Sequence, residues 1–137
     1  KAYRDSVFVV GNIGTPYTGA SLEMKEDSVT VAEMSSFQLE TIDTFHPKVS
    51  AIFKYYTRSF NRHHTMEAYI QAKEEITKNQ TEEDVCVLNY EDEVLRAFGE
   101  KLHTQVLYFS SRRKLERGIY LEDGKIILCR WKAGSAL

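Results

Sequence analysis

Long apolar runs, closely spaced cysteines and an excess of one charge are all missing from this sequence of 137 residues. No apolar stretch approaches the roughly 20 residues that a membrane-spanning helix requires. Residues 1–5 contain no apolar core of the kind that a signal peptide has. The net charge of −2 gives no general reason to expect nucleic acid or a membrane as a partner. We therefore expect a cytoplasmic protein.

Cysteine is scarce, since Cys86 and Cys129 are the only two in the chain. Each lies in an apolar, strand-like run, and the chain is therefore expected to carry two buried free thiols in a reducing compartment. Two cysteines without a short spacing give almost no support for a zinc site. Repeats and low-complexity segments are also missing, and together with the length this indicates a single ordinary domain.

Apolar runs that alternate with helical patterns are what the sequence does contain. Strand-like runs cover residues 6–10, 29–32, 48–53, 84–89, 105–109, 119–121 and 126–129. Helical patterns cover residues 17–25, 66–79 and 92–102. Strands that alternate with helices predict an α/β fold, with a mainly parallel sheet flanked by helices. The last two strands flank an Asp-Gly turn, which predicts a C-terminal β-hairpin.

Polar side chains gather in the motif EMSSFQLE, at residues 33–40, directly after an apolar run. Ligands of α/β sheets bind at the carboxyl ends of strands, so this cluster predicts a site for a polar ligand. The turn GNIGTP, at 11–16, could present backbone N–H groups to an anion, although a plain strand-to-helix turn is favoured. Lys73 lies beside an apolar helical stripe, where its stem can pack while its ammonium reaches water.

Two basic segments are less informative. Residues 54–64 mix basic and aromatic side chains, which is weak evidence for binding of single-stranded nucleic acid. Residues 110–117 form a polar, basic connection. Neither segment outweighs the acidic balance of the chain, and we expect no nucleic-acid partner and no membrane partner. We expect a monomer, with association through uncovered sheet edges as the alternative.

Five motifs taken together resemble the central, ATP-binding domain of the Mur ligases. They are GNIGTP at 11–16, EMSSFQLE at 33–40, RHHTME at 62–67, YIQAK at 69–73 and VLN at 87–89. The resemblance runs from about Val7 to Cys129 and is strongest to the ligases that add D-glutamate to UDP-N-acetylmuramoyl-L-alanine. It implies an ATP-dependent amide ligase of peptidoglycan synthesis that works through an acyl phosphate, with Mg²⁺ as its metal.

The resemblance also implies roles for individual residues. Glu33 takes the position of a magnesium ligand, and hard oxygen ligands suit this metal in phosphoryl transfer. Asn12, Ser35 and Gln38 take positions at or near the muramoyl substrate. Lys73 falls at the family's carbamylated lysine, which makes it the expected catalytic residue and, once carbamylated, a second magnesium ligand.

Two departures from the family pattern qualify this expectation. The family's P-loop and its N-terminal and C-terminal domains are not among these 137 residues. Residues 1–137 are thus predicted to be one partial central domain, with 130–137 as a tail outside the family and with no activity of its own. In addition, Lys54, Arg58 and Ser59 stand where the family has asparagine, aspartate and a metal-binding histidine. A base in place of an acid should weaken metal binding.

A compensated frameshift would explain the second departure. One inserted base before the codon of Lys54, followed by one deleted base, converts a family-like peptide into the sequence of residues 53–62. Two alternatives to a ligase portion therefore stay open. The chain could be a non-catalytic remnant that binds the UDP-muramoyl substrate, or the product of a truncated, frameshifted gene without function.

Overall fold

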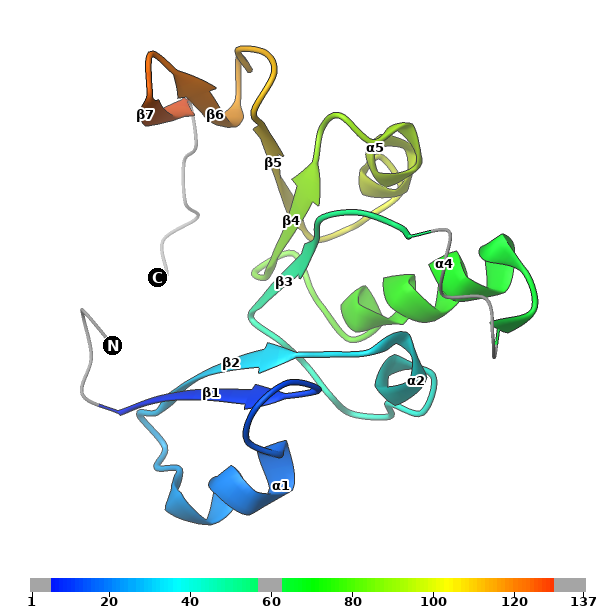
Figure 1. The fold of residues 1–137 in the computed structure, drawn as a ribbon, viewed down its shortest axis with the longest axis vertical. Helices are drawn as coiled ribbons and strands as arrows, with labels where there is room; N and C mark the ends of the chain where they lie inside the picture. The colour runs from blue at the N-terminus through cyan, green and yellow to red at the C-terminus, as the bar shows by residue number, and fades with distance from the viewer. Residues whose placement is uncertain (1–5, 57–62, 130–137) are drawn as a thin grey trace. The chain divides into compact units, whose positions relative to one another are not determined.

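The computed structural model describes residues 6–56 and 63–129, and these form parts of two compact units, Lys1–Thr41 and Ile42–Leu137. Each unit contains parallel strands joined by helices (Figure 1). The predicted α/β class, with its mainly parallel strands, is therefore confirmed. The parallel strands are divided between a two-stranded sheet in the first unit and a five-stranded sheet in the second. None of the helices in the described part of the chain has the length and apolarity that a bilayer crossing needs.

The first unit contains two strands and two short helices. Strand β1 (Val7–Gly11) pairs in parallel with β2 (Val29–Glu33), and their last residues, Gly11 and Glu33, are register partners. Between them lie helix α1 (Tyr17–Ala20) and a 3₁₀ turn (Ser21–Glu23), and helix α2 (Ser36–Leu39) follows β2. The helix expected over 17–25 is thus shorter than predicted and ends in a 3₁₀ turn.

Side chains of the first unit alternate between buried and exposed along the strands. Val10 and Leu39 are almost fully buried, whereas Val9 and Val31 are exposed and are register partners on one face of the small sheet. A strand places successive side chains on opposite faces, which explains how Val9 and Val10 can differ so strongly. The small sheet therefore has one face packed within its unit and one apolar face that its own unit leaves open.

The second unit is a five-stranded sheet with the order β3-β4-β5-β6-β7. The strands are β3 (Val49–Ile52), β4 (Val85–Asn89), β5 (Gln105–Ser110), β6 (Gly118–Glu122) and β7 (Lys125–Cys129). All neighbouring pairs from β3 to β6 are parallel, and β7 runs antiparallel to β6. The turn residues Asp123 and Gly124 both have positive φ, as a type I′ hairpin turn requires, so the predicted hairpin is confirmed.

Two helices pack on one side of this sheet (Figure 1). They are α4 (Met66–Glu74), which continues as a 3₁₀ turn (Glu75–Thr77), and α5 (Glu93–Gly99). Their shared core consists of Ile52, Tyr55, Tyr69, Cys86, Leu88 and Leu95. Both helices begin at capping residues, because the side chains of Thr65 and Asp92 accept hydrogen bonds from the first-turn N–H groups.

The two cysteines differ in burial. Cys86 is fully buried, and burial raises the pKa of its thiol to about 11. Cys129 is a free thiol of intermediate exposure, so its expected burial was wrong. The reason is its place on β7, the last strand of the sheet, where the apolar neighbours Ile126 and Leu128 are also exposed.

Polar side chains fasten the segment that leads into β3. This segment, Ile42–Lys48, receives hydrogen bonds on its backbone carbonyls from three consecutive side chains, Lys78, Asn79 and Gln80. Asp84, just before β4, is fully buried and accepts from His46 Nε2 at 2.6 Å and from the Thr81 N–H at 2.7 Å. The lead-in to β3 is therefore held to the residues before β4 by a dense polar network, and we call Ile42–Lys48 the lead-in segment.

Candidate functional site

Asn12 and Glu33 lie together at the carboxyl ends of β1 and β2. The parallel register brings the ends of both strands to the same edge, and the N–H of Asn12 donates to the carbonyl of Glu33 at 2.8 Å. The side chains also meet, since Asn12 Nδ2 lies 3.4 Å from Glu33 Oε1. Both side chains are exposed. Two sequence-predicted site residues, 21 positions apart, are thus neighbours, and they present carboxylate and amide oxygens to solvent.

Gly11 allows this close approach of the two strand ends. Its φ is +122°, and a Cβ at this position would collide with the backbone carbonyl of Glu33. A glycine adopts this backbone conformation readily and carries no side chain that would collide. Gly11 therefore permits the short distance between Asn12 and Glu33, and any larger residue would force the two strand ends apart.

Ser35 and Gln38 are joined to each other in a capping box at the start of α2. The Gln38 N–H donates to Ser35 Oγ at 3.3 Å, and Gln38 Oε1 accepts from the Ser35 N–H and hydroxyl at 2.9 Å each. Sequence reasoning assigned both residues to a ligand and missed this pairing. The signal was present, because Ser-x-x-Gln at the start of a helix is a known capping pattern.

Lys73 lies in the last turn of α4, in the second unit, and its side chain is of intermediate exposure. Its neighbour Glu74 accepts a hydrogen bond from the hydroxyl of Tyr55 at 3.2 Å. Burial raises the pKa of both partners of this pair, and the charge of Glu74 raises that of Tyr55 further. Lys73 is therefore followed directly by two carboxylates, Glu74 and Glu75, at the end of α4.

Three residues, Lys54, Arg58 and Ser59, depart from the family pattern, and the structure describes only the first of them. Arg58 and Ser59 lie outside the described residues. Lys54 is exposed, and its ammonium lies 5.6 Å from the centre of the Tyr56 ring. Tyr55, in the same segment, is buried in the core of the second unit and forms an edge-to-face pair with Tyr69. The altered segment 53–62 therefore contributes to the core of the second unit, because Tyr55 is buried there and its hydroxyl donates to Glu74.

The described residues contain no group of three or more histidine, cysteine, aspartate or glutamate side chains that could hold a metal ion. The donor set at Asn12 and Glu33 nevertheless fits Mg²⁺, which prefers oxygen ligands and keeps several waters of its own. One carboxylate and substrate oxygens suffice for such a site. Glu33 can fill this role, because its side chain is exposed and has a single long contact, with Asn12.

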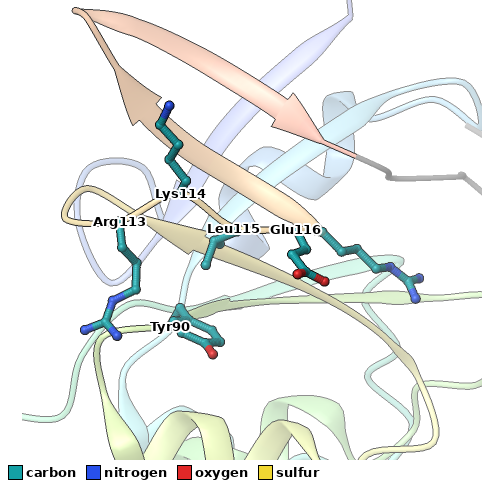
Figure 2. A pocket seen from close by; sticks show the side chains of 6 residues that line it. Tyr90, Arg113, Lys114, Leu115 and Glu116 are labelled. Atoms are coloured by element: carbon teal, nitrogen blue, oxygen red, sulfur yellow. The ribbon is translucent and has the colours of Figure 1, made fainter.

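A pocket of about 390 Å³ lies at the carboxyl ends of β4 and β5 (Figure 2). Its lining residues are Tyr90, Arg113, Lys114, Leu115, Glu116 and Arg117. Arg113 and Leu115 reach toward the side on which Tyr90 lies, whereas Lys114 points away from it. The pocket is open to solvent on one side. Sequence reasoning treated this basic connection as a loop, although its position after a parallel strand was the available signal.

Two acidic residues offset the positive charge around this pocket. Arg113 binds both carboxylate oxygens of Glu91, and Lys114 forms an ion pair with Glu122. The hydrogen bond from Ser110 and those from Arg113 hold the pKa of Glu91 below its usual value. The pocket therefore has an aromatic wall, and two of its cations, Arg113 and Lys114, are already oriented by paired carboxylates.

Comparison with known proteins identifies the class of this fold and site. Residues 7–133 match the Mur ligase middle domain. The chain therefore belongs to the Mur ligase family, and the predicted resemblance is confirmed. The match ends within the predicted tail 130–137, which itself lies outside the described residues.

Similar proteins narrow this class further. The chain is 61% identical over 127 residues to the UDP-N-acetylmuramoylalanine–D-glutamate ligase of Lachnoclostridium phytofermentans. Proteins of the same name from Clostridioides difficile and Lachnospira eligens are 52% and 54% identical. These alignments cover 92–93% of the chain but only 28% of each relative. The chain thus spans somewhat more than a quarter of the length of the ligases that it matches.

Proposed function

We propose that the chain is the middle-domain portion of an ATP-dependent ligase of peptidoglycan synthesis. The ligase joins D-glutamate to UDP-N-acetylmuramoyl-L-alanine through an acyl phosphate. The observation that carries this proposal is the meeting of Asn12 and Glu33 at the shared end of β1 and β2, in a chain whose relatives bear that activity in their names. Residues 1–137 are one partial domain in this proposal. The cytoplasmic location and the monomeric state stay predictions.

Each site residue has a role in this proposal. Glu33 supplies a carboxylate oxygen to Mg²⁺, and Asn12 and Ser35 bind the substrate near its diphosphate. The metal would neutralise phosphate charge during phosphoryl transfer. Gln38 holds Ser35 through the capping box and lies near the same ligand. Lys73 is proposed to be carbamylated and, in that form, to be the catalytic residue and a magnesium ligand.

ATP is proposed to bind in the second unit, at the pocket beside Tyr90. Three features of this pocket support the proposal. The pocket lies at the carboxyl ends of parallel strands, where α/β proteins bind ligands. Its lining includes the cationic side chains of Arg113 and Arg117, and the ring of Tyr90 offers a surface on which a base can stack.

The isolated 137 residues are proposed to bind the muramoyl substrate without turning it over. Arg58 and Ser59 replace an acid and a metal-binding histidine of the family, and phosphoryl transfer depends on metal and phosphate being positioned together. The test is release of inorganic phosphate in the presence of ATP, Mg²⁺, D-glutamate and UDP-N-acetylmuramoyl-L-alanine. We expect no release above the rate without protein. Turnover by the isolated chain would refute this part of the proposal.

Binding of the muramoyl substrate is tested by calorimetry. We expect micromolar to millimolar affinity, weakened at least about tenfold by Asn12→Ala, which removes an exposed side chain and the hydrogen bonds that it offers to the ligand. Ser21→Ala is the matched control, because Ser21 is an exposed polar residue of the same unit and donates locally to the carbonyl of Thr18. Equal affinities for both variants would refute the assigned site.

A non-catalytic binding remnant is the second candidate function. The observation that favours it is the contrast between the intact contacts of Asn12, Glu33 and Ser35 and the altered residues at 58 and 59. Both candidates predict substrate binding by the 137 residues. They differ in the complete gene product: restored activity after Arg58→Asp and Ser59→His would favour a ligase with two damaging changes, and persistent inactivity would favour the remnant.

A further inference from the structure

We propose that Glu91 is the positioning residue of the pocket, holding the loop 111–117 as a preformed wall against Tyr90. The inference rests on the proposed function for the identity of the ligand, ATP. Glu91 does not line the pocket itself, but its carboxylate holds the loop that does. Nothing in the sequence pattern marked this residue, which follows the VLN motif by two positions.

The carboxylate of Glu91 accepts three hydrogen bonds from residues at the end of β5. Oε1 accepts from Ser110 Oγ at 2.6 Å and from Arg113 Nε at 3.0 Å, and Oε2 accepts from Arg113 Nη2 at 2.8 Å. The paired contacts to Arg113 are the bidentate arrangement that fixes a guanidinium in direction as well as in distance. The side chain of Glu91 is 13% exposed and that of Arg113 is 56% exposed, so the pair is shielded on the carboxylate side only.

Ser110 carries the effect of Glu91 into the backbone of the loop. Its hydroxyl donates to Glu91, and its oxygen accepts from the N–H groups of Arg112 and Arg113, each at 3.0 Å. Ser110 itself is buried. The carboxylate therefore orients a hydroxyl that in turn orients the first turn of the loop, so that one residue fixes both the backbone and the guanidinium of Arg113.

The backbone of Tyr90, on the opposite wall of the pocket, is held by contacts that do not involve Glu91. The N–H of Tyr90 donates to the carbonyl of Phe109 at 2.9 Å, and Arg96 donates to the carbonyl of Tyr90 at 2.6 Å. The guanidinium of Arg96 lies 5.2 Å from the centre of the Tyr90 ring, and that of Arg113 lies 5.8 Å from it. Loss of the Glu91 contacts should hence release the loop, together with the Arg113 guanidinium near the ring, while the backbone of Tyr90 stays in place.

The test compares Glu91→Gln with Glu93→Gln. Glutamine keeps the shape of Glu91 but loses its charge and one acceptor, so the variant should fold. Glu93 is a matched control two positions away: it also pairs with an arginine, Arg96, but its side chain is 88% exposed and the contact is 3.6 Å long. Glu91→Asp is the conservative variant, which keeps the charge on a shorter stem.

Two measurements are made on each variant, both on the full chain. Nuclear magnetic resonance follows the Nε–H signal of Arg113 and the hydrogen exchange of the amides of Arg112 and Arg113, and calorimetry measures ATP affinity. For Glu91→Gln we expect at least about tenfold faster exchange and at least about tenfold weaker ATP binding. Glu93→Gln should stay within about twofold of the unchanged chain in both, and Glu91→Asp should fall between them.

The outcomes separate this inference from the proposed function. If the unchanged chain does not bind ATP, the ligand assignment fails, while the exchange data still decide whether Glu91 orders the loop. If Glu91→Gln exchanges and binds like Glu93→Gln, the positioning role is refuted. If exchange rises but ATP affinity is unchanged, Glu91 is structural and does not position the pocket.

Discussion

Glu33 and Asp84 are both carboxylates next to a parallel strand, yet the protein surrounds them in opposite ways. Asp84 precedes β4, is fully buried and receives hydrogen bonds from His46 and from the N–H and hydroxyl of Thr81, with Lys48 3.1 Å away. Glu33 ends β2, is exposed and has one 3.4 Å contact, with Asn12. The first carboxylate is buried and held by several groups of the protein, which meet mainly at Oδ2, and the second keeps its oxygens open to solvent.

This difference teaches which end of a parallel strand serves stability and which serves binding. At the amino end of β4, the polar network of Asp84 fastens the lead-in segment Ile42–Lys48 to the fold. At the carboxyl end of β2, the open oxygens are available to a ligand, in line with the general place of ligand sites in α/β sheets. The predictions below test this division, from the largest expected effect on stability to the smallest.

Asp84→Asn should be the most destabilising of these substitutions. It removes the charge that pairs with Lys48 and His46 and puts a poorer acceptor at a fully buried position, which we expect to lower the free energy of unfolding by about 3 kcal/mol. Urea unfolding followed by circular dichroism measures the change. The exposed neighbour Glu83→Gln is the control. A loss below about 1 kcal/mol would show that the network contributes little to stability.

Acid should destabilise the second unit through the same residue. Burial alone raises the pKa of Asp84, but the hydrogen bonds from His46, Thr81 and Lys48 outweigh it and hold the pKa well below its usual value. A carboxyl with a depressed pKa in the folded state stabilises the fold above its unfolded pKa. This stability is lost as the pH falls below about 4.

Unfolding curves between pH 7 and pH 2 check this prediction. The stability of the unchanged chain should fall through the acid range, and that of Asp84→Asn should depend less on pH there. Parallel pH profiles for the two proteins would mean that other carboxylates control acid unfolding.

Gln38→Ala should have a smaller effect, because it removes one half of the capping box at α2. We expect a loss of about 0.5–1 kcal/mol and faster hydrogen exchange of the Ser35 amide, whose acceptor is Gln38 Oε1. Gln38→Glu is the matched variant, because glutamate also completes a capping box. It should keep the protected amide. If Gln38→Ala left the Ser35 amide unchanged, the capping box would not persist in solution.

Glu33→Gln should have the smallest effect on stability and the largest on the ligand. The side chain is exposed with one long contact, so the free energy of unfolding should stay within about 0.5 kcal/mol. The same change removes the charge that Mg²⁺ needs, so Mg²⁺-dependent tightening of muramoyl-substrate binding should disappear in calorimetry. A marked destabilisation, or unchanged Mg²⁺ dependence, would place Glu33 with Asp84 among the structural carboxylates.

The sequence by itself determined the elements that depend on neighbouring residues. The continuous apolar run Val85-Cys86-Val87-Leu88 predicted a buried strand, and the pair Asp123-Gly124 predicted the hairpin turn. The five motifs, with EMSSFQLE among them, together indicated the family, which the match over residues 7–133 confirms. These features are local because side-chain periodicity and turn conformation are set over a few residues of chain.

Only the tertiary structure decided which distant side chains meet. Asp84 and His46 are 38 positions apart, and Glu91 and Arg113 are 22 apart, yet each pair is joined by hydrogen bonds. The burial of Tyr55 and the partial exposure of Cys129 were equally out of reach of the sequence pattern. Such contacts depend on strand order and register, and a one-residue shift in register would exchange the buried and exposed faces without changing a single local motif.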